Sequence, residues 1–165
     1  MLRLTLVRHA KSEPAYSGQS DWERALEAQG LRDAPKMAIR LKERGLKPDR
    51  ILSSPAVRAI TTANLLASEL GVPANLVIQD ERLYLASSTA IFEVVRELGG
   101  NVPHLMIVGH NPGLTEFADE VSSERSVDHL PTCGVYSLLF EIRSWNELEP
   151  ATGVDAELDY PNRPY

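Results

Sequence analysis

The sequence predicts an α/β fold of three layers, in which a mostly parallel sheet lies between two layers of helices. Short apolar runs alternate along the chain with longer segments whose apolar residues recur every three or four positions, as strands alternating with helices do. Several runs are apolar almost throughout, as expected of strands buried on both faces of a parallel sheet. At 165 residues the chain is long enough for one well-buried core and short for two, so we expect one domain over residues 1–165.

Composition narrows the class of protein. A hydrophobic fraction of 43% and a charged fraction of 24% are ordinary for a globular protein and exclude a disordered or collagen-like chain. No apolar run approaches the roughly 18 residues that cross a bilayer, and residues 1–10 lack the cleavage site of a signal peptide. The single cysteine excludes an intramolecular disulfide. These features predict a cytoplasmic protein.

The net charge limits the classes of partner that the protein is expected to bind. A formal charge of -6 argues against non-specific binding to nucleic acid, which usually requires a basic face. We therefore expect neither nucleic acid nor a membrane as a partner. An anionic substrate must be held by a local cluster of cations.

The first predicted strand covers residues 4–7 and leads directly into Arg8 and His9. In open α/β sheets, ligands bind where loops leave the carboxyl ends of the strands. Arg8 offers a planar fork of donors that suits phosphate, and His9 can attack as a neutral imidazole near pH 7. Alone, such a pair is more often a solvated turn. The repetition of this arrangement along the chain favours a phosphoryl-transfer site.

The first predicted helix follows an irregular stretch. Residues 14–21 show no periodicity and predict an ordered loop near the site, and residues 21–30 lead into the helix. Its apolar face obeys the i, i+3, i+4, i+7 rule, and Gly45 is expected to end it. That face consists of Ala34, Met37, Ala38 and Leu41.

The second unit pairs a short strand at residues 50–52 with a helix whose apolar face covers residues 56–70. Ser53 or Ser54 is expected to cap this helix, and the proline after them suits its first position. Arg58 then lies in the first helical turn, directly after a strand.

The third unit pairs a strand at residues 76–78 with a helix that begins at Ser87 or Ser88 and stops at a pair of glycines, residues 99–100. Charged residues, among them Glu81, follow the strand immediately. Here too charge appears just past an apolar run.

The fourth unit is the clearest. Residues 105–108 form a near-continuous apolar run, and Gly109, His110 and Asn111 follow it before the next helical pattern at residues 114–121. The helix start after Asn111 offers free N–H groups that attract anions.

The end of the chain is less regular. Residues 122–131 predict a loop, and residues 134–142 predict a last strand. The tail, residues 144–165, shows no period, so we expect it to be peripheral and to pack or fray at the surface.

The strand-to-helix loops of a parallel sheet lie along one edge. Arg8 with His9, Arg58, Glu81 and His110 each follow a different strand, so we expect them to converge although about a hundred residues separate the first from the last. Two arginines and histidines around one site can balance a dianionic phosphate and supply the charge stabilisation that phosphoryl transfer needs.

Three segments carry a resemblance to a known family. Residues 8–12, Arg-His-Ala-Lys-Ser, resemble the Arg-His-Gly signature of the histidine phosphatase superfamily, with Ala10 in place of glycine. Residues 53–63 and 108–113 resemble its second-arginine and second-histidine segments. The alanine is similar to that of several short phosphohistidine phosphatases of the SixA type. Over residues 3–115 the resemblance implies a phosphoglycerate mutase-like fold and the same convergence.

The residues and the resemblance together assign roles. His9 is the expected nucleophile, Arg8 and Arg58 the phosphate clamps, and His110 a donor to a phosphate oxygen. Ser12, Gly109 and Asn111 belong to the same segments and are assigned to substrate binding.

The general acid is open between two glutamates. The resemblance places Glu81 where phosphoglycerate mutases carry their catalytic glutamate, and Glu13, close to the nucleophile, is the rival. A leaving imidazole needs less help from an acid than an alkoxide does.

The other candidate residues receive structural interpretations. His104 and His129 are expected at the surface, and Cys133 in the core. The four histidines lack the spacing of a zinc site, so we expect no metal and no other cofactor.

The sequence therefore predicts a metal-independent phosphatase that works through a covalent phosphohistidine and acts on phosphohistidine in a protein. A phosphatase for a small phosphorylated metabolite and a mutase are the alternative enzymes. A phosphate-binding module without catalysis is the alternative outside the enzymes.

Overall fold

The apolar runs of the sequence form a mixed sheet. The structure, a computed structural model, describes residues 1–124 and 127–164. Within these residues the sheet has six strands in the order β3-β2-β4-β1-β5-β6. Four strands run parallel, whereas β5 is antiparallel to β1 and β6 to β5. The strands are β1 (Leu2–Arg8), β2 (Arg50–Ser53), β3 (Val77–Gln79), β4 (His104–Gly109), β5 (Val135–Phe140) and β6 (Val154–Asp159).

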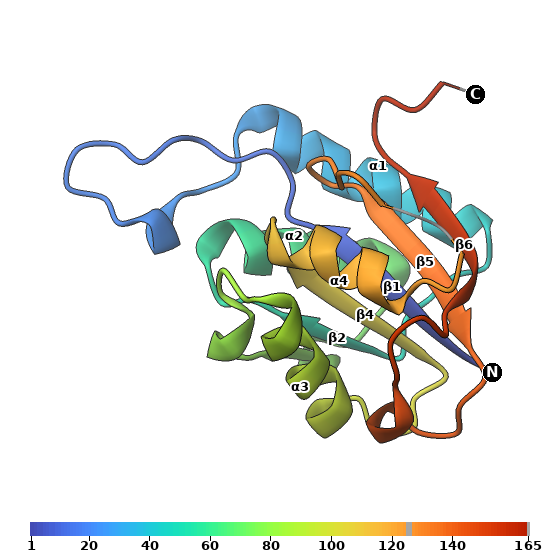
Figure 1. The fold of residues 1–165 in the computed structure, drawn as a ribbon. Coiled ribbons are helices and arrows are strands. Elements are labelled where there is room, and N and C mark those ends of the chain that lie inside the picture. The colour runs from blue at the N-terminus through green and yellow to red at the C-terminus, as the bar shows by residue number, and fades with distance from the viewer. Residues whose placement is uncertain (125–126, 165) are drawn as a thin grey trace.

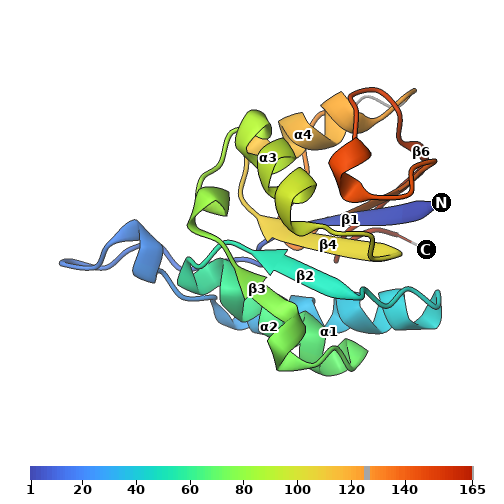
Figure 2. The same cartoon turned by 90° about the horizontal axis from the view of Figure 1, so that it is seen from below.

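Helices cover both faces of the sheet, which confirms the predicted three layers. Figures 1 and 2 show α1 (Ala28–Glu43) and α2 (Val57–Leu70) on one face and α3 (Ser88–Leu98) and α4 (Gly113–Val121) on the other. Short 3-10 helices at Asp21–Glu23, Ala74–Leu76, Glu81–Leu83 and Trp145–Glu147 complete the described elements.

The sheet divides the interior into two apolar cores because side chains alternate along a strand. In β1, Leu4 and Leu6 pack toward α3 and α4, whereas Val7 packs toward α1 and α2. In β4, Ile107 and Val108 divide between the same two cores, and every residue of this strand is buried. The near-continuous apolar run is therefore confirmed as a strand buried on both faces.

The start of α2 differs from the expectation. The helix begins at Val57, so Arg58 does lie in its first turn, but neither serine caps it. Instead the Ser54 hydroxyl accepts a hydrogen bond from the Ala56 N–H at 3.2 Å and bonds to His110. The prediction of a serine cap was wrong because Ser54 turns toward the site.

The tail is more ordered than predicted. β6 adds a sixth strand at the sheet edge, and Trp145 is fully buried, with its indole N–H donating to the Val102 carbonyl at 3.0 Å. The sheet thus continues past the strand that was expected to be the last. No helix in the described part of the chain has the length and apolar character of a membrane-crossing segment.

Candidate active site

A pocket of about 380 Å³ opens where β1, β2 and β4 end, at the carboxyl edge of the sheet. It is lined by six residues predicted for the site, Arg8, His9, Ser12, Arg58, His110 and Asn111, and by five more, Lys11, Asp21, Arg24, Leu85 and Thr132. Four of these eleven side chains are cations, and the only carboxylate among them is Asp21. The lining therefore suits an anion.

The ring of His9 is held in one tautomer. Its Nδ1–H donates to the Ala10 carbonyl at 2.8 Å, because a carbonyl can only accept. In the neutral ring this bond leaves the lone pair on Nε2. His9 is 7% exposed, and burial lowers the pKa of its imidazole to about 4, with Arg58, Arg8 and Arg24 contributing in the same direction. His9 is therefore neutral at pH 7.

His110 faces His9, with the ring centroids 5.2 Å apart. Its Nε2 lies 2.7 Å from the Ser54 hydroxyl. We assign that hydroxyl as the donor, since its oxygen already accepts from Ala56 and the ring nitrogen is its nearest acceptor among the described contacts. The proton of the ring then sits on Nδ1, which is buried and has no partner among the described residues. Burial lowers the pKa of His110 to about 3, so it too is neutral at pH 7.

The two arginines enter from different elements. Arg8 ends β1 and donates from Nη1 to the Leu130 carbonyl at 3.3 Å. Arg58 is 2% exposed and donates from Nη1 to the Asp21 carbonyl at 2.7 Å and from Nη2 to the Asp21 carboxylate at 2.9 Å. In both arginines Nε is buried and has no partner among the described residues. These two N–H groups therefore have no acceptor among the described residues.

Loop residues complete the lining. Arg24 donates to the Asp21 carboxylate and to the Ser12 hydroxyl, each at 2.9 Å. Asn111 uses its side chain within the protein, since its amide donates to the Leu130 carbonyl at 2.8 Å. Gly109 lies outside the lining, and its carbonyl accepts the His9 N–H at 3.1 Å. Of these predicted substrate-binding residues, Ser12 and Asn111 therefore line the pocket, whereas Gly109 supports it from outside.

The structure does not bring the two candidate acids into the pocket. Glu81 starts the 3-10 helix after β3 and is exposed, and Glu13 is exposed in the first loop. Neither lies among the lining residues. From the same short segment as Glu81, Tyr84 turns inward and donates its hydroxyl to the Asp21 carboxylate at 2.6 Å.

The sequence predicted neither Asp21, Arg24 nor Tyr84 as a residue of the site, nor the contact of Ser54 with His110. The signal for Asp21 and Arg24 was weak, because both lie in a loop without periodicity. For Ser54 the signal was its place directly after a strand, as for Arg8 and His9.

The predictions for the remaining histidines and the cysteine are partly right and partly wrong. His104 was expected at the surface, but it is 6% exposed, because β4 begins with it and its ring bonds to the Thr5 hydroxyl at 2.7 Å. His129 is exposed and Cys133 is fully buried, as predicted. Among the described residues, no three histidine, cysteine or acidic side chains are grouped as a metal site would need.

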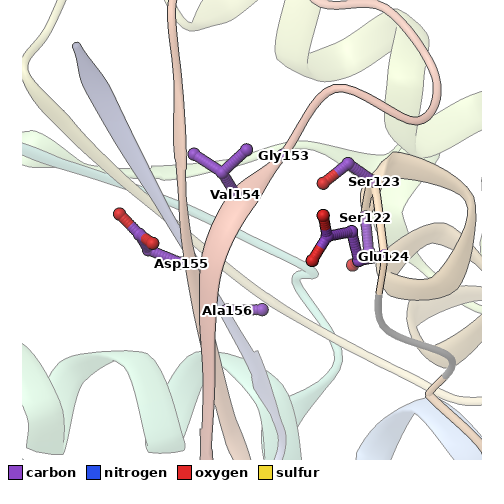
Figure 3. Close-up of a pocket in the computed structure, with 7 residues that line it drawn as sticks. All are labelled: Ser122, Ser123, Glu124, Gly153, Val154, Asp155 and Ala156. Atoms are coloured by element: carbon purple, nitrogen blue, oxygen red, sulfur yellow. The ribbon is translucent and has the colours of Figure 1, made fainter.

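A second, larger cavity of about 520 Å³ lies away from this edge, between the end of α4 and β6. Figure 3 shows Ser122, Ser123 and Glu124 on one side of this cavity and Asp155 on the other side of the β6 segment. Its described lining carries two acids and no cation, so it does not suit an anionic substrate.

Comparison with known sequences gives two matches of interest. The model of the histidine phosphatase superfamily (branch 1) matches residues 4–84. An uncharacterized protein of Mycobacterium tuberculosis is 32% identical over 154 residues, which cover 87% of this chain and 92% of the relative.

Solved structures share the fold along nearly the whole chain. A Nakamurella multipartitia protein assigned as the phosphohistidine phosphatase SixA superposes with a TM-score of 0.84 at 20% identity, covering 98% of this chain and 97% of that one. Its counterpart from Agrobacterium tumefaciens gives 0.77 at 27% identity, covering 84% and 92%. A mycobacterial glucosyl-3-phosphoglycerate phosphatase gives 0.65 at 18% identity, covering 98% and 99%. Proteins named for phosphohistidine and for a small metabolite thus share this architecture.

Proposed function

The chain belongs to the histidine phosphatase superfamily, and from that premise we propose that it is a metal-independent phosphatase for phosphohistidine in proteins. The family and the structural neighbours indicate a phosphatase in the broad sense. The choice of substrate and the roles of individual residues rest on the geometry of the pocket.

In the first step the lone pair on Nε2 of His9 attacks phosphorus. A bond forms between Nε2 and phosphorus while the bond from phosphorus to the substrate nitrogen breaks, and the electron pair of that bond leaves with the substrate imidazole. The Ala10 carbonyl keeps the proton on Nδ1, so the attacking nitrogen stays unprotonated. A water oxygen then forms a bond to phosphorus while the bond from phosphorus to Nε2 of His9 breaks; its electron pair returns to Nε2, a proton of the water passes to solvent, and inorganic phosphate leaves.

Charge on the transferring phosphoryl group is balanced by Arg8, Arg58 and His110. The buried Nε–H groups of both arginines and the Nδ1–H of His110 lack partners among the described residues. A phosphate oxygen at each supplies the missing acceptor. Preorganised donors of this kind usually contribute the largest share of the rate.

The observation that carries the choice of substrate is the state of Asp21. It is the only carboxyl group among the described lining residues, and hydrogen bonds from Tyr84 first, then from Arg24 and Arg58, hold its pKa well below the usual range. Asp21 therefore has no proton to give a leaving group. An alkoxide needs such a proton, whereas the imidazole of phosphohistidine can carry its own on the second ring nitrogen and leave as a neutral molecule.

The test is a panel of substrates assayed in the presence of EDTA. We expect kcat/KM to be highest on a phosphohistidine peptide, lower on an aryl phosphate and lowest on a sugar phosphate. His9→Ala measured in parallel removes the background of contaminating phosphatases. A higher kcat/KM on the sugar phosphate, or activity only with added divalent ion, contradicts the proposal.

One observation favours a phosphatase for a small metabolite as the second candidate. The Lys11 side chain at the pocket is 49% exposed and its one described ion pair, with Glu27, is 3.4 Å long. A second anionic group on a small substrate suits this cation. Lys11→Met separates the candidates, because only a substrate with a second anion should show a raised KM.

A further inference from the structure

The pocket contains a carboxylate where an anion is to bind, and this needs an explanation. Asp21 lines the pocket beside His9 and His110, and its negative charge repels phosphate. Its side chain is 43% exposed and lies in the loop before α1, outside both apolar cores. Its contribution to the site must therefore come from the side chains to which it is hydrogen-bonded.

Asp21 fixes the position of the Arg58 guanidinium group. Asp21 accepts two hydrogen bonds from the Arg58 guanidinium, through its carbonyl and through Oδ2 of its carboxylate, and the Tyr84 hydroxyl also interacts with this guanidinium. A guanidinium fixed along one edge keeps its plane, and its Nε–H and remaining terminal N–H groups then point in set directions. The orientation of Arg58 toward phosphate thus depends on the orientation of Asp21.

Asp21 is in turn held by Tyr84. The tyrosine hydroxyl donates at 2.6 Å to Oδ2, the same oxygen that Arg58 Nη2 reaches, while Arg24 occupies Oδ1. A short hydrogen bond to an ionised carboxylate is among the strong ones. It directs the carboxylate oxygen that Arg58 uses and disperses charge that otherwise faces the phosphate.

Tyr84 is itself fixed by rings on two sides. Its ring packs against Trp22 with centroids 4.6 Å apart and meets the ring of His110 edge-on at 5.6 Å. Trp22 follows Asp21 in the loop, and His110 follows β4. Tyr84 therefore connects the segment of Asp21 and Trp22 to His110 at the carboxyl edge of the sheet.

We propose that Tyr84 is a positioning residue that orients the phosphate clamp Arg58 through Asp21. This inference rests on the proposed function, in which Arg58 binds the transferring phosphoryl group. Tyr84 does not touch phosphorus or the nucleophile in this scheme; it acts because Asp21 without the hydroxyl can rotate, and Arg58 then loses its fixed plane.

The test begins with Tyr84→Phe, which removes only the hydroxyl and retains the ring contacts. We expect kcat/KM on the phosphohistidine peptide to fall about tenfold, mostly through kcat, because a hydrogen bond to a charged group is lost and part of that loss reaches Arg58. Tyr16→Phe is the matched control, since Tyr16 is 68% exposed in the first loop, and it should change kcat/KM less than twofold. An unchanged kcat/KM in Tyr84→Phe overturns the inference.

A double-mutant cycle separates positioning from direct contact with substrate. In an Asp21→Ala background, which removes both carboxylate oxygens, Tyr84→Phe should cost less than twofold further, because the carboxylate that links its hydroxyl to Arg58 is already absent. Losses that multiply across the two substitutions show that Tyr84 acts without Asp21 and overturn the inference.

Binding of tungstate, measured by calorimetry, makes failure of this inference distinguishable from failure of the proposed function. The wild type should bind this oxyanion and Tyr84→Phe should bind it about fivefold to tenfold more weakly. No binding by the wild type removes the oxyanion site on which both proposals depend. Equal binding by both proteins overturns the role of Tyr84 alone, and binding without turnover of phosphohistidine overturns the proposed substrate alone.

Discussion

The two ends of the central sheet both bury histidine, yet the pocket lined by His9, His110 and four cations lies at the carboxyl end. At the amino end His104 bonds through its ring to the Thr5 hydroxyl and to the backbone of Lys47, and its own N–H donates to the Asp49 carboxylate. At the carboxyl end His9 keeps a lone pair on Nε2, and His110 keeps an unpartnered Nδ1 among the described residues.

The comparison shows that burial alone does not make a histidine part of the candidate active site. Burial is the first cause of the lowered pKa of all three rings, to about 4 for His9 and His104 and to about 3 for His110. The pKa therefore does not distinguish a site from a structural histidine. The distinguishing features are ring atoms not bonded within the protein and two arginines, Arg8 and Arg58, that face them.

The largest expected effect comes from removing His9, the proposed nucleophile. His9→Ala should lower kcat by about 10⁴-fold or more, because alanine offers no atom to form the covalent intermediate. Mixing with labelled substrate should leave acid-labile, base-stable label on the wild type. Label that survives acid, or that appears equally on His9→Ala, contradicts a covalent phosphohistidine at this residue.

Removing the second ring at this end should cost less. His110→Ala should lower kcat by about 10²–10³-fold, the range for one donor to developing charge, while covalent labelling of His9 remains detectable at long times. Circular dichroism checks that the fold survives. If kcat falls less than threefold, the unpartnered Nδ1 of His110 has no part in the transition state.

A smaller effect is expected from a residue at the same end but outside the pocket. Glu81→Gln should lower kcat/KM on a phosphohistidine peptide by about tenfold or less, because the imidazole leaves without help. The control substrate is an alkyl phosphate. A loss of about 10²–10⁴-fold confined to that substrate assigns the acid role to Glu81, and an equal loss on both gives Glu81 another task.

The sequence predicts this end of the sheet well and its loops poorly, for physical reasons. Arg8, His9, Arg58 and His110 follow buried strands, and parallel strands end along one edge, so their convergence follows from topology. Asp21 reaches Arg58 across 37 positions from a loop, and no periodicity in a loop reports its path.

Two further differences have local causes. A strand end predicts the segment from Glu81 to Tyr84 but not which side chain reaches Asp21; it is Tyr84, which directly follows the 3-10 helix. The β6 strand did carry a signal, since its half-buried residues alternate with exposed ones, Val154, Ala156 and Leu158 against Asp155 and Glu157. The acidic residues between the apolar ones hid this alternation, because the tail was assessed by its overall composition.

The smallest effect on activity is expected at the amino end, and it tests the comparison most directly. His104→Gln should leave kcat/KM within twofold, because this ring has no route to the pocket, but should lower the free energy of unfolding at pH 8 by about 1–3 kcal/mol through lost hydrogen bonds.

The pH dependence has a definite sign. The pKa of His104 is about 4 in the folded protein and near 6.5 when unfolded. Between those values the unfolded chain binds the extra proton, so stability rises with pH there and is lost as pH falls, by at most about 1.4 kcal/mol per pH unit for each such histidine. Urea unfolding of His104→Gln should therefore approach that of the wild type as pH falls from 6.5 toward 4.

His129→Gln, at an exposed histidine, is the matched control and should change neither stability nor activity. A stability difference that stays constant with pH contradicts a neutral buried His104, and a loss of kcat/KM beyond tenfold in a folded His104→Gln variant means that the two ends of the sheet are coupled.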